Sequence, residues 1–181
     1  GKWLRKALSS VFGDRAGVQR CQVHKMRNVR DRLSKNRHGY VMRQMREAYR
    51  SASVKTAKKL LQQLISWLEN NDEEAAAASL KEGLDETLTC LSLQLPGALY
   101  RTFSTTNPIE NMNGTIRRIG RNVKRWRGGT MIVRWAAAGI LEAQRRFRHV
   151  KGHKNMPKLI EALAALQPNT VVQLASRKKV A

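Results

Sequence analysis

Residues 104–122 hold the side chains whose types and spacing are best suited to chemistry. The run STTNPIENMNGTIRRIGRN predicts a helix start, with Asn107 as the N-cap, Pro108 at the first helical position and Glu110 at the third. A glutamate at that position can close a capping box, and roughly half of such glutamates do nothing else. Glu110 therefore has a purely structural interpretation beside the chemical one.

Two features of the sequence favour a chemical role for Glu110. Residues 101–154 contain 13 Lys and Arg but only one other carboxylate, Glu142. Four further polar or small residues of the helix project near the same face as Glu110, namely Asn113, Gly114, Arg117 and Arg118. A carboxylate, an amide, a glycine that allows close approach and two guanidiniums suit a metal ion held against a phosphodiester.

The charge balance of the chain points to a polyanionic partner. The 181 residues include 35 Lys and Arg against 13 Asp and Glu, a formal net charge of +22. Nucleic acid is the commonest partner of such a protein. A helical nucleic-acid-binding module without chemistry, such as a ribosomal or architectural protein, would show the same excess, so this second function stays open.

A basic stretch downstream of Glu110 predicts the contact with DNA phosphates. Its members are Arg117, Arg118, Arg121, Lys124, Arg125 and Arg127. Trp126 lies among them, and an aromatic ring in a basic loop can stack on an unpaired base. Packing of Trp126 on the protein core explains its presence equally well.

The elements that must position these residues are predicted to be mainly helices, with at most one or two short strands. Residues 18–23 form the one plausible strand, because they are short and partly alternating. The helix that starts at Thr130 has an apolar first half, including Trp135, which predicts a place in the core. Apolar spacing also indicates helices over residues 3–11, 24–34, 38–50, 54–68, 73–95 and 156–166.

Residues 53–95 are predicted to form an antiparallel helical hairpin that is an appendage to the rest of the chain. Ser53 can cap its first helix and Asp72 its second. Seven of the 13 carboxylates fall in residues 69–86, beside a single basic residue, Lys81. We expect this acidic helix to face away from the nucleic acid.

Three motifs, in the same order along the chain, resemble those of bacterial mutator-like insertion-sequence transposases. The segment TNPIENMNGTIRR at residues 106–118 resembles the one that carries the last acidic residue of that family. The segment QRCQVHKMRN at residues 19–28 resembles its Cys-x2-His signature, and WRG and RW at residues 126–128 and 134–135 also fit. Together the motifs cover nearly the whole chain.

The resemblance implies a DDE-type DNA transposase whose RNase H-like catalytic core is interrupted by a helical insertion. It divides this chain into the end of the core (1–30), the insertion (31–96), the final-glutamate helix with the closing helices of the core (97–166), and a basic tail (167–181). The implied reaction is cut-and-paste transposition of an insertion sequence by two-metal phosphodiester hydrolysis and strand transfer.

The same resemblance assigns roles and partners. Glu110 is the implied catalytic ligand of Mg²⁺ or Mn²⁺, and the residues implied as active-site support are Cys21, His24, Asn107 and Asn113. The implied partners are the element's terminal repeats and target DNA, together with further copies of the full-length protein. The implied location is the bacterial cytoplasm, in association with DNA.

The two aspartates of the implied acidic triad are expected upstream of Gly1. The family's second Asp lies well before the Cys-x2-His signature, whereas Asp14 is too close to Cys21 and Asp31 lies beyond the signature. We therefore expect a C-terminal fragment that holds one third of the triad and is inactive alone.

Cysteine usage and hydropathy set further bounds. Cys21 and Cys90 are far apart, so they offer no disulfide framework, which fits a reducing cytosol. Cys21 and His24 could form half of a zinc site, but the other three histidines are scattered without paired spacing. No apolar run approaches the ~20 residues of a membrane span.

Overall fold

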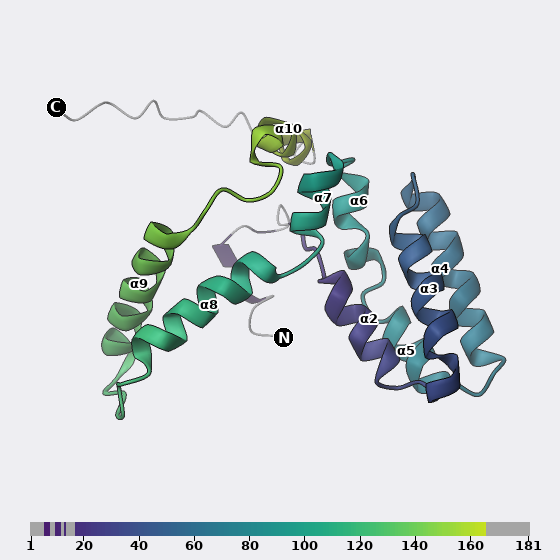
Figure 1. Cartoon of the computed structure of the whole chain (residues 1–181), viewed down its shortest axis with the longest axis horizontal. Helices are drawn as coiled ribbons and strands as arrows, with labels where there is room; N and C mark the ends of the chain where they lie inside the picture. The colour runs from purple at the N-terminus through teal and green to yellow at the C-terminus, as the bar shows by residue number, and fades with distance from the viewer. Residues whose placement is uncertain (1–5, 8–9, 12, 14–16, 166–181) are drawn as a thin grey trace.

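A computed structural model describes residues 6–7, 10–11, 13 and 17–165, and this part of the chain contains helices and no strand (Figure 1). The prediction of a mainly α fold is confirmed. The helix expected over residues 3–11 and the basic tail at 167–181 fall largely outside the described residues. The α-helices are α2 (Gln22–Arg30), α3 (His38–Tyr49), α4 (Val54–Glu69), α5 (Glu74–Lys81), α6 (Thr89–Ser92), α7 (Gly97–Phe103), α8 (Asn107–Gly120), α9 (Gly129–Arg146) and α10 (Met156–Ala165), and the 3₁₀ helices are η2 (Lys35–Arg37), η3 (Asp85–Thr87) and η4 (His153–Asn155).

Helices α2 to α5 pack into a bundle around the hydrophobic core. The prediction for α4 is confirmed, because the Ser53 hydroxyl accepts a hydrogen bond from the Thr56 amide at 3.1 Å and caps the helix. Its apolar face is buried against α3 and α5. The buried core residues contributed by these helices include Val29, Val41, Met45, Leu61, Leu68, Ala76 and Leu80. We call this part the bundle.

A buried lysine joins α2 to the end of α5. The Lys25 ammonium donates hydrogen bonds to the carbonyls of Ser79 at 2.6 Å and Glu82 at 2.5 Å. Carbonyls at a helix C-terminus lack intrahelical partners, so Lys25 satisfies them as a cap. Burial lowers the pKa of Lys25, and the two carbonyls offset part of the cost of desolvating its charge.

The structure corrects the prediction for the second half of residues 53–95. Asp72 has φ of 59°, in the left-handed region, and is not an N-cap; Glu73 occupies that position instead. The buried Glu73 carboxylate accepts from the Ser34 amide at 3.2 Å. The expected single helix ends at Lys81, and two shorter helices, η3 and α6, follow it. Because α4 and α5 share one core with α2 and α3, they are not a separate appendage.

Residues 18–23 do not form the predicted strand. Residues 17–21 have no regular secondary structure, and α2 begins at Gln22. Their polar groups are satisfied by the turn around η3: the Arg20 amide donates to the Glu86 carbonyl at 2.8 Å, and the Thr89 hydroxyl donates to the Val18 carbonyl at 2.7 Å. An extended segment becomes a strand only when it pairs with another, and no described segment pairs with this one.

Helices α8 and α9 form a two-helix arm that extends away from the bundle (Figure 1). They approach most closely at Gly139, where an added Cβ atom would lie 2.8 Å from the Cα atom of Ile116. Ala143, one turn further along α9, is also buried. Small residues on one face of α9 therefore permit the close packing of the two helices.

The apolar first half of α9 is not buried as predicted. Trp135 is only partly buried. The large apolar side chains of α9 that are exposed are Ile132 (50%), Val133 (67%), Ile140 (44%) and Leu141 (61%). The reason is geometric, because α9 packs mainly against α8 and one neighbour covers only one face of a helix.

The chain that leaves α9 returns to α7. Gly152 has φ of +88°, and an added Cβ atom would lie 2.8 Å from the Leu99 amide nitrogen. The Thr102 hydroxyl donates to the Lys151 carbonyl at 3.0 Å. These contacts anchor residues 147–155 beside the start of α8, and α10 follows as the predicted last helix.

Candidate active site and nucleic-acid interface

Gln22 fixes the start of α2 beside the turn between α7 and α8. Its backbone amide donates to the Ser104 carbonyl at 2.9 Å. Its side-chain amide is buried and donates to the Thr87 carbonyl and to the Tyr100 hydroxyl, each at 2.9 Å. Segments more than 80 residues apart in sequence therefore meet at a defined place, and His24 and Glu110 lie on either side of it.

The carboxylate of Glu110 is held through one of its two oxygens. Its Oε1 atom accepts a hydrogen bond from the Thr106 hydroxyl at 2.8 Å and lies 3.3 Å from Nε2 of His24. The Thr106 hydroxyl is also 3.3 Å from Nδ1 of His24. No described residue forms a hydrogen bond or ion pair with Oε2 of Glu110, whose side chain is half exposed. One carboxylate oxygen is thus oriented by the protein and the other can take an external ligand.

The structure corrects the predicted helix cap. The N-cap of α8 is Thr106, Asn107 is the first helical residue, and Glu110 is the fourth. In a capping box the glutamate side chain returns to the backbone amide of the N-cap residue. Here it accepts from the side chain of Thr106, and the backbone amide of Glu110 donates to the Thr106 carbonyl at 2.8 Å as in any helix. The Glu110 carboxylate therefore does not close a capping box.

The other three residues expected to support the site, Asn107, Asn113 and Cys21, do not join the contacts around Glu110. Asn107 and Asn113 are exposed on α8. Cys21 is partly buried immediately before α2. Within the described part of the chain, none of these three forms a hydrogen bond or ion pair with Glu110 through its side chain, so His24 is the predicted support residue that the fold brings to it.

A zinc site around Cys21 and His24 has no further ligands among the described residues. No group of three or more His, Cys, Asp and Glu in residues 17–165 and the short described segments before them could hold a metal ion. Cys90 is buried, and burial raises its pKa to about 11. Its thiol is therefore protonated near neutral pH and is a poor metal ligand.

The predicted DNA-binding Lys and Arg side chains are all exposed on the end of α8 and the loop that follows it, and we call them the basic track. Helix α8 turns its partly buried apolar side chains, Met112, Ile116 and Ile119, away from solvent and leaves its polar face open. Arg117 lies about 10 Å along the helix axis from Glu110, from the rise per residue. In the described structure, no acidic side chain pairs with any member of this track, which consists of Arg117, Arg118, Arg121, Lys124, Arg125 and Arg127.

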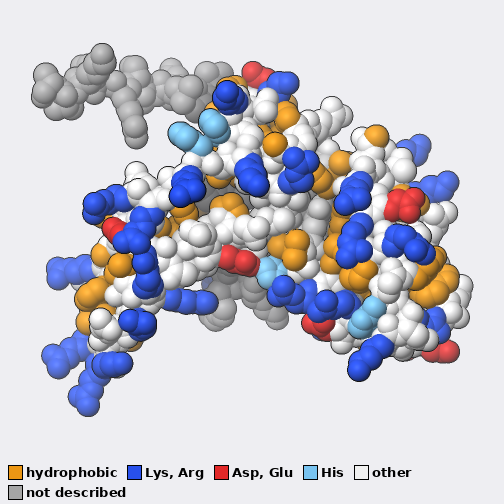
Figure 2. Space-filling model, viewed as in Figure 1, with side chains coloured by type: hydrophobic (Ala, Val, Ile, Leu, Met, Phe, Trp, Pro, Cys, Tyr) orange, Lys and Arg blue, Asp and Glu red, His pale blue; other side chains and the backbone are white. Residues whose placement is uncertain are grey.

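Basic side chains gather over the arm in the space-filling view (Figure 2). Gly114 has nothing within 4 Å of an added Cβ atom, so the face between Glu110 and the arginines is open to a close approach. Trp126 is 48% exposed, and its ring lies over Gly120, with an added Cβ atom there 3.5 Å from the ring. The ring therefore covers the end of α8 with one part and faces solvent with the rest.

Comparison with known protein families shows the family of the chain. The family model described as "Transposase, Mutator family" matches residues 2–149. The chain belongs to the Mutator family of transposases. No curated protein and no solved structure matches it. Membership of a transposase family implies DNA as a partner of the protein.

The structure of this transposase also shows residues that the sequence did not single out. Thr106 lies four residues before Glu110, and that helical spacing is a signal that could have linked the two side chains. Gln22 and Tyr100 carry no such signal, because their hydrogen bond joins segments that meet only in the folded chain. None of the described helices is long and apolar enough to span a membrane.

Proposed function

We propose that Glu110 is the last carboxylate of a DDE-type active site that cuts and rejoins DNA in cut-and-paste transposition. The observation that carries this proposal is the state of its carboxylate: Oε1 is held by Thr106 and faces His24, while Oε2 has no partner among the described residues. The exposed arginine track begins two turns further along the same helix. Such a helix places an oxygen ligand and phosphate-binding groups along one face.

The donor chemistry of the site fits a divalent metal ion only in part. Glu110 supplies one hard oxygen ligand of the kind that Mg²⁺ and Mn²⁺ prefer. One carboxylate does not complete such a site, and we propose that two aspartates N-terminal to Gly1 supply the rest. Bound metal ions supply activation of the attacking water or 3′-hydroxyl and stabilisation of the leaving oxygen.

The residues of this chain then have distinct tasks. Thr106 and His24 fix the rotamer of Glu110, so that its free oxygen is held in place before a ligand arrives. The arginine track binds the phosphates of the element ends and of the target DNA. In this proposal α8 and α9 belong to an RNase H-like core, the bundle forms most of its helical insertion, and the enzyme acts as a homo-oligomer.

The test compares two glutamates in the complete transposase that carries the upstream aspartates. Glu110→Gln keeps the size of the side chain and an oxygen that can accept from Thr106, but it removes the negative charge. We expect Mg²⁺-dependent cleavage of the element ends to fall by orders of magnitude while the melting temperature is unchanged, because an amide is a weaker ligand than a carboxylate.

Glu142→Gln is the matched control. Glu142 is the other carboxylate in residues 101–154, and it pairs with Arg145 and Arg146 on α9. Its replacement should leave cleavage nearly unchanged, because these are exposed pairs of small energy. Full cleavage by the Glu110→Gln enzyme would refute the proposal, and a large fall in its melting temperature would assign Glu110 a structural role instead.

A further inference from the structure

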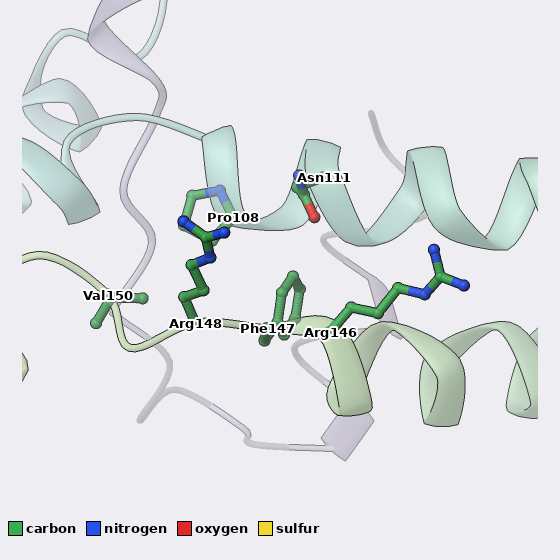
Figure 3. Close-up of a pocket in the computed structure, with 6 residues that line it drawn as sticks. All are labelled: Pro108, Asn111, Arg146, Phe147, Arg148 and Val150. Atoms are coloured by element: carbon green, nitrogen blue, oxygen red, sulfur yellow. The ribbon is translucent and has the colours of Figure 1, made fainter.

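A groove lies between the first turns of α8 and the chain that leaves α9 (Figure 3). Its volume is about 410 Å³, within the range of about 300–1,000 Å³ that is typical of ligand pockets. The groove is lined by Pro108, Asn111, Arg146, Phe147, Arg148 and Val150. No carboxylate lines it, so it favours an anionic occupant.

Phe147 supplies an exposed aromatic surface in this groove. It is the C-cap of α9, with φ of −65° and ψ of 125°, so the chain becomes extended there and its ring leaves the helix surface. Figure 3 shows the ring in the space between α8 and the end of α9. The side chain is 47% exposed, although a phenylalanine without a polar atom gains most from burial. A planar apolar surface is therefore available to a planar ligand.

Polar groups stand on both sides of the ring. Asn111, on α8, has a side-chain amide that offers both a donor and an acceptor. Arg148 forms no ion pair in the described structure, whereas Arg146 is paired with Glu142. A free guanidinium is a phosphate ligand. The groove thus combines an aromatic face, an amide and a cation within one small volume.

We propose that this groove binds one unpaired nucleotide of a DNA strand. The base stacks on Phe147, its edge meets the amide of Asn111, and the neighbouring phosphate pairs with Arg148. A base inside a duplex is stacked on both faces and paired along its edge, so only an unpaired base can enter such a groove. The inference rests on the proposed function only for the identity of the substrate as DNA.

The place of the groove gives this nucleotide a role. Asn111 directly follows Glu110 on α8, and the two side chains project about 100° apart around the helix. A nucleotide in the groove therefore lies within about one turn of the proposed catalytic carboxylate. A base pair at a strand end opens more readily than one inside a duplex, so the groove is positioned to hold an opened strand end beside the proposed site of cutting.

The test measures binding of the full chain to DNA in buffer with EDTA, where no cleavage can occur. The probes are a blunt duplex and the same duplex with a short single-stranded overhang that carries the fluorescent base 2-aminopurine. We expect the overhang duplex to bind more tightly and the 2-aminopurine fluorescence to be quenched by stacking. Phe147→Ala should weaken binding of the overhang duplex by roughly five- to hundredfold, the range that base–aromatic stacking contributes.

Three variants separate the possible outcomes. Phe147→Tyr should retain both the preference and the quenching, because it keeps the aromatic face. Leu141→Ala, at another exposed apolar residue of α9, should leave binding unchanged. The preference is measured without cleavage, so failure of the catalytic proposal would not disturb this result. Equal binding of blunt and overhang duplexes, or a preference that survives in Phe147→Ala, would overturn the inference.

Discussion

The bundle and the arm both contain long amphipathic helices, but they bury the apolar faces of these helices to different extents. Helix α4 in the bundle has 16 residues and buries five apolar side chains, because α3 and α5 pack against it. Helix α9 in the arm has 18 residues, yet it buries only Gly139 and Ala143 and leaves four large apolar side chains exposed. The number of neighbouring helices, and not the apolar pattern of each helix, decides how much of a helix is buried.

The two regions also differ in whether their charged side chains are paired. Five carboxylates of residues 69–86 form ion pairs with Lys or Arg, including Glu82 and Glu86 with Arg20 at 3.0 and 2.8 Å, and Asp85 with Lys58 at 2.8 Å. In the arm the basic track of α8 has no acidic partner in the described structure. Most carboxylates of residues 69–86 are therefore paired, whereas the basic track of the arm is open to a partner.

The largest expected difference between the regions is in stability. Leu61→Ala, at a fully buried position of α4, should lower the free energy of unfolding by about 2–5 kcal/mol, because it removes buried methyl groups and leaves a cavity. The matched change in the arm, Leu141→Ala, removes a side chain that is 61% exposed. It should change the free energy of unfolding by less than about 0.5 kcal/mol. Urea unfolding followed by circular dichroism measures both; equal losses would show that α9 is buried in solution.

The next effect concerns DNA binding. Replacing Arg121, Lys124 and Arg125 by Ala removes three charges from the arm. The negative slope of the logarithm of the binding constant against the logarithm of the salt concentration should become shallower by about three, since each phosphate contact contributes about 0.9. Replacing Lys55, Lys58 and Lys59 by Ala removes the same charge from α4 and should change the slope by less than about one. Titration of a labelled duplex over a range of salt concentrations distinguishes them, and a larger change for the α4 variant would place the DNA on the bundle.

The smallest effect tests the packing inside the arm. A Cβ atom at Gly139 would lie 2.8 Å from the Cα atom of Ile116, so Gly139→Ala should separate α8 from α9. The free energy of unfolding should fall by about 1 kcal/mol, after the gain in helix propensity is included. Gly114→Ala meets nothing within 4 Å and should stabilise α8 by about 0.5–1 kcal/mol. Hydrogen exchange of the α8 and α9 amides should accelerate in the first variant and slow in the second. Slower exchange in both would contradict the close contact.

Local patterns were sufficient for several helices and for some of their ends. The apolar spacing of residues 54–68 and the hydroxyl of Ser53 predicted α4 and its cap, because both depend on residues within a few positions of one another. The Asn-Pro-Ile-Glu segment predicted α8 for the same reason, and its helical register aligned Glu110 with Arg117. The basic track was also predicted, since its residues are close in sequence and all are exposed.

Local patterns failed where a distant segment competes for the same group. Asn107 has the properties of an N-cap, but it is the first helical residue of α8. The N-cap is Thr106, whose hydroxyl contacts both Glu110 and His24 from α2. Asp72 also resembles a cap, but the buried carboxylate next to it, that of Glu73, binds the Ser34 amide from the α2–α3 connection. In both cases a contact across the fold fixes where the helix begins.

The helical composition of the transposase, its excess of positive charge and its family all follow from the order of its residues. Which apolar faces are covered, which acidic groups are paired and which residues meet Glu110 depend on how the helices pack. His24 and Glu110 are 86 positions apart in the chain, and they approach to 3.3 Å because the buried amide of Gln22 joins α2 to the η3 turn and to α7. A hydrogen bond of that kind depends on the path of the whole chain between its two ends, and no local pattern encodes it.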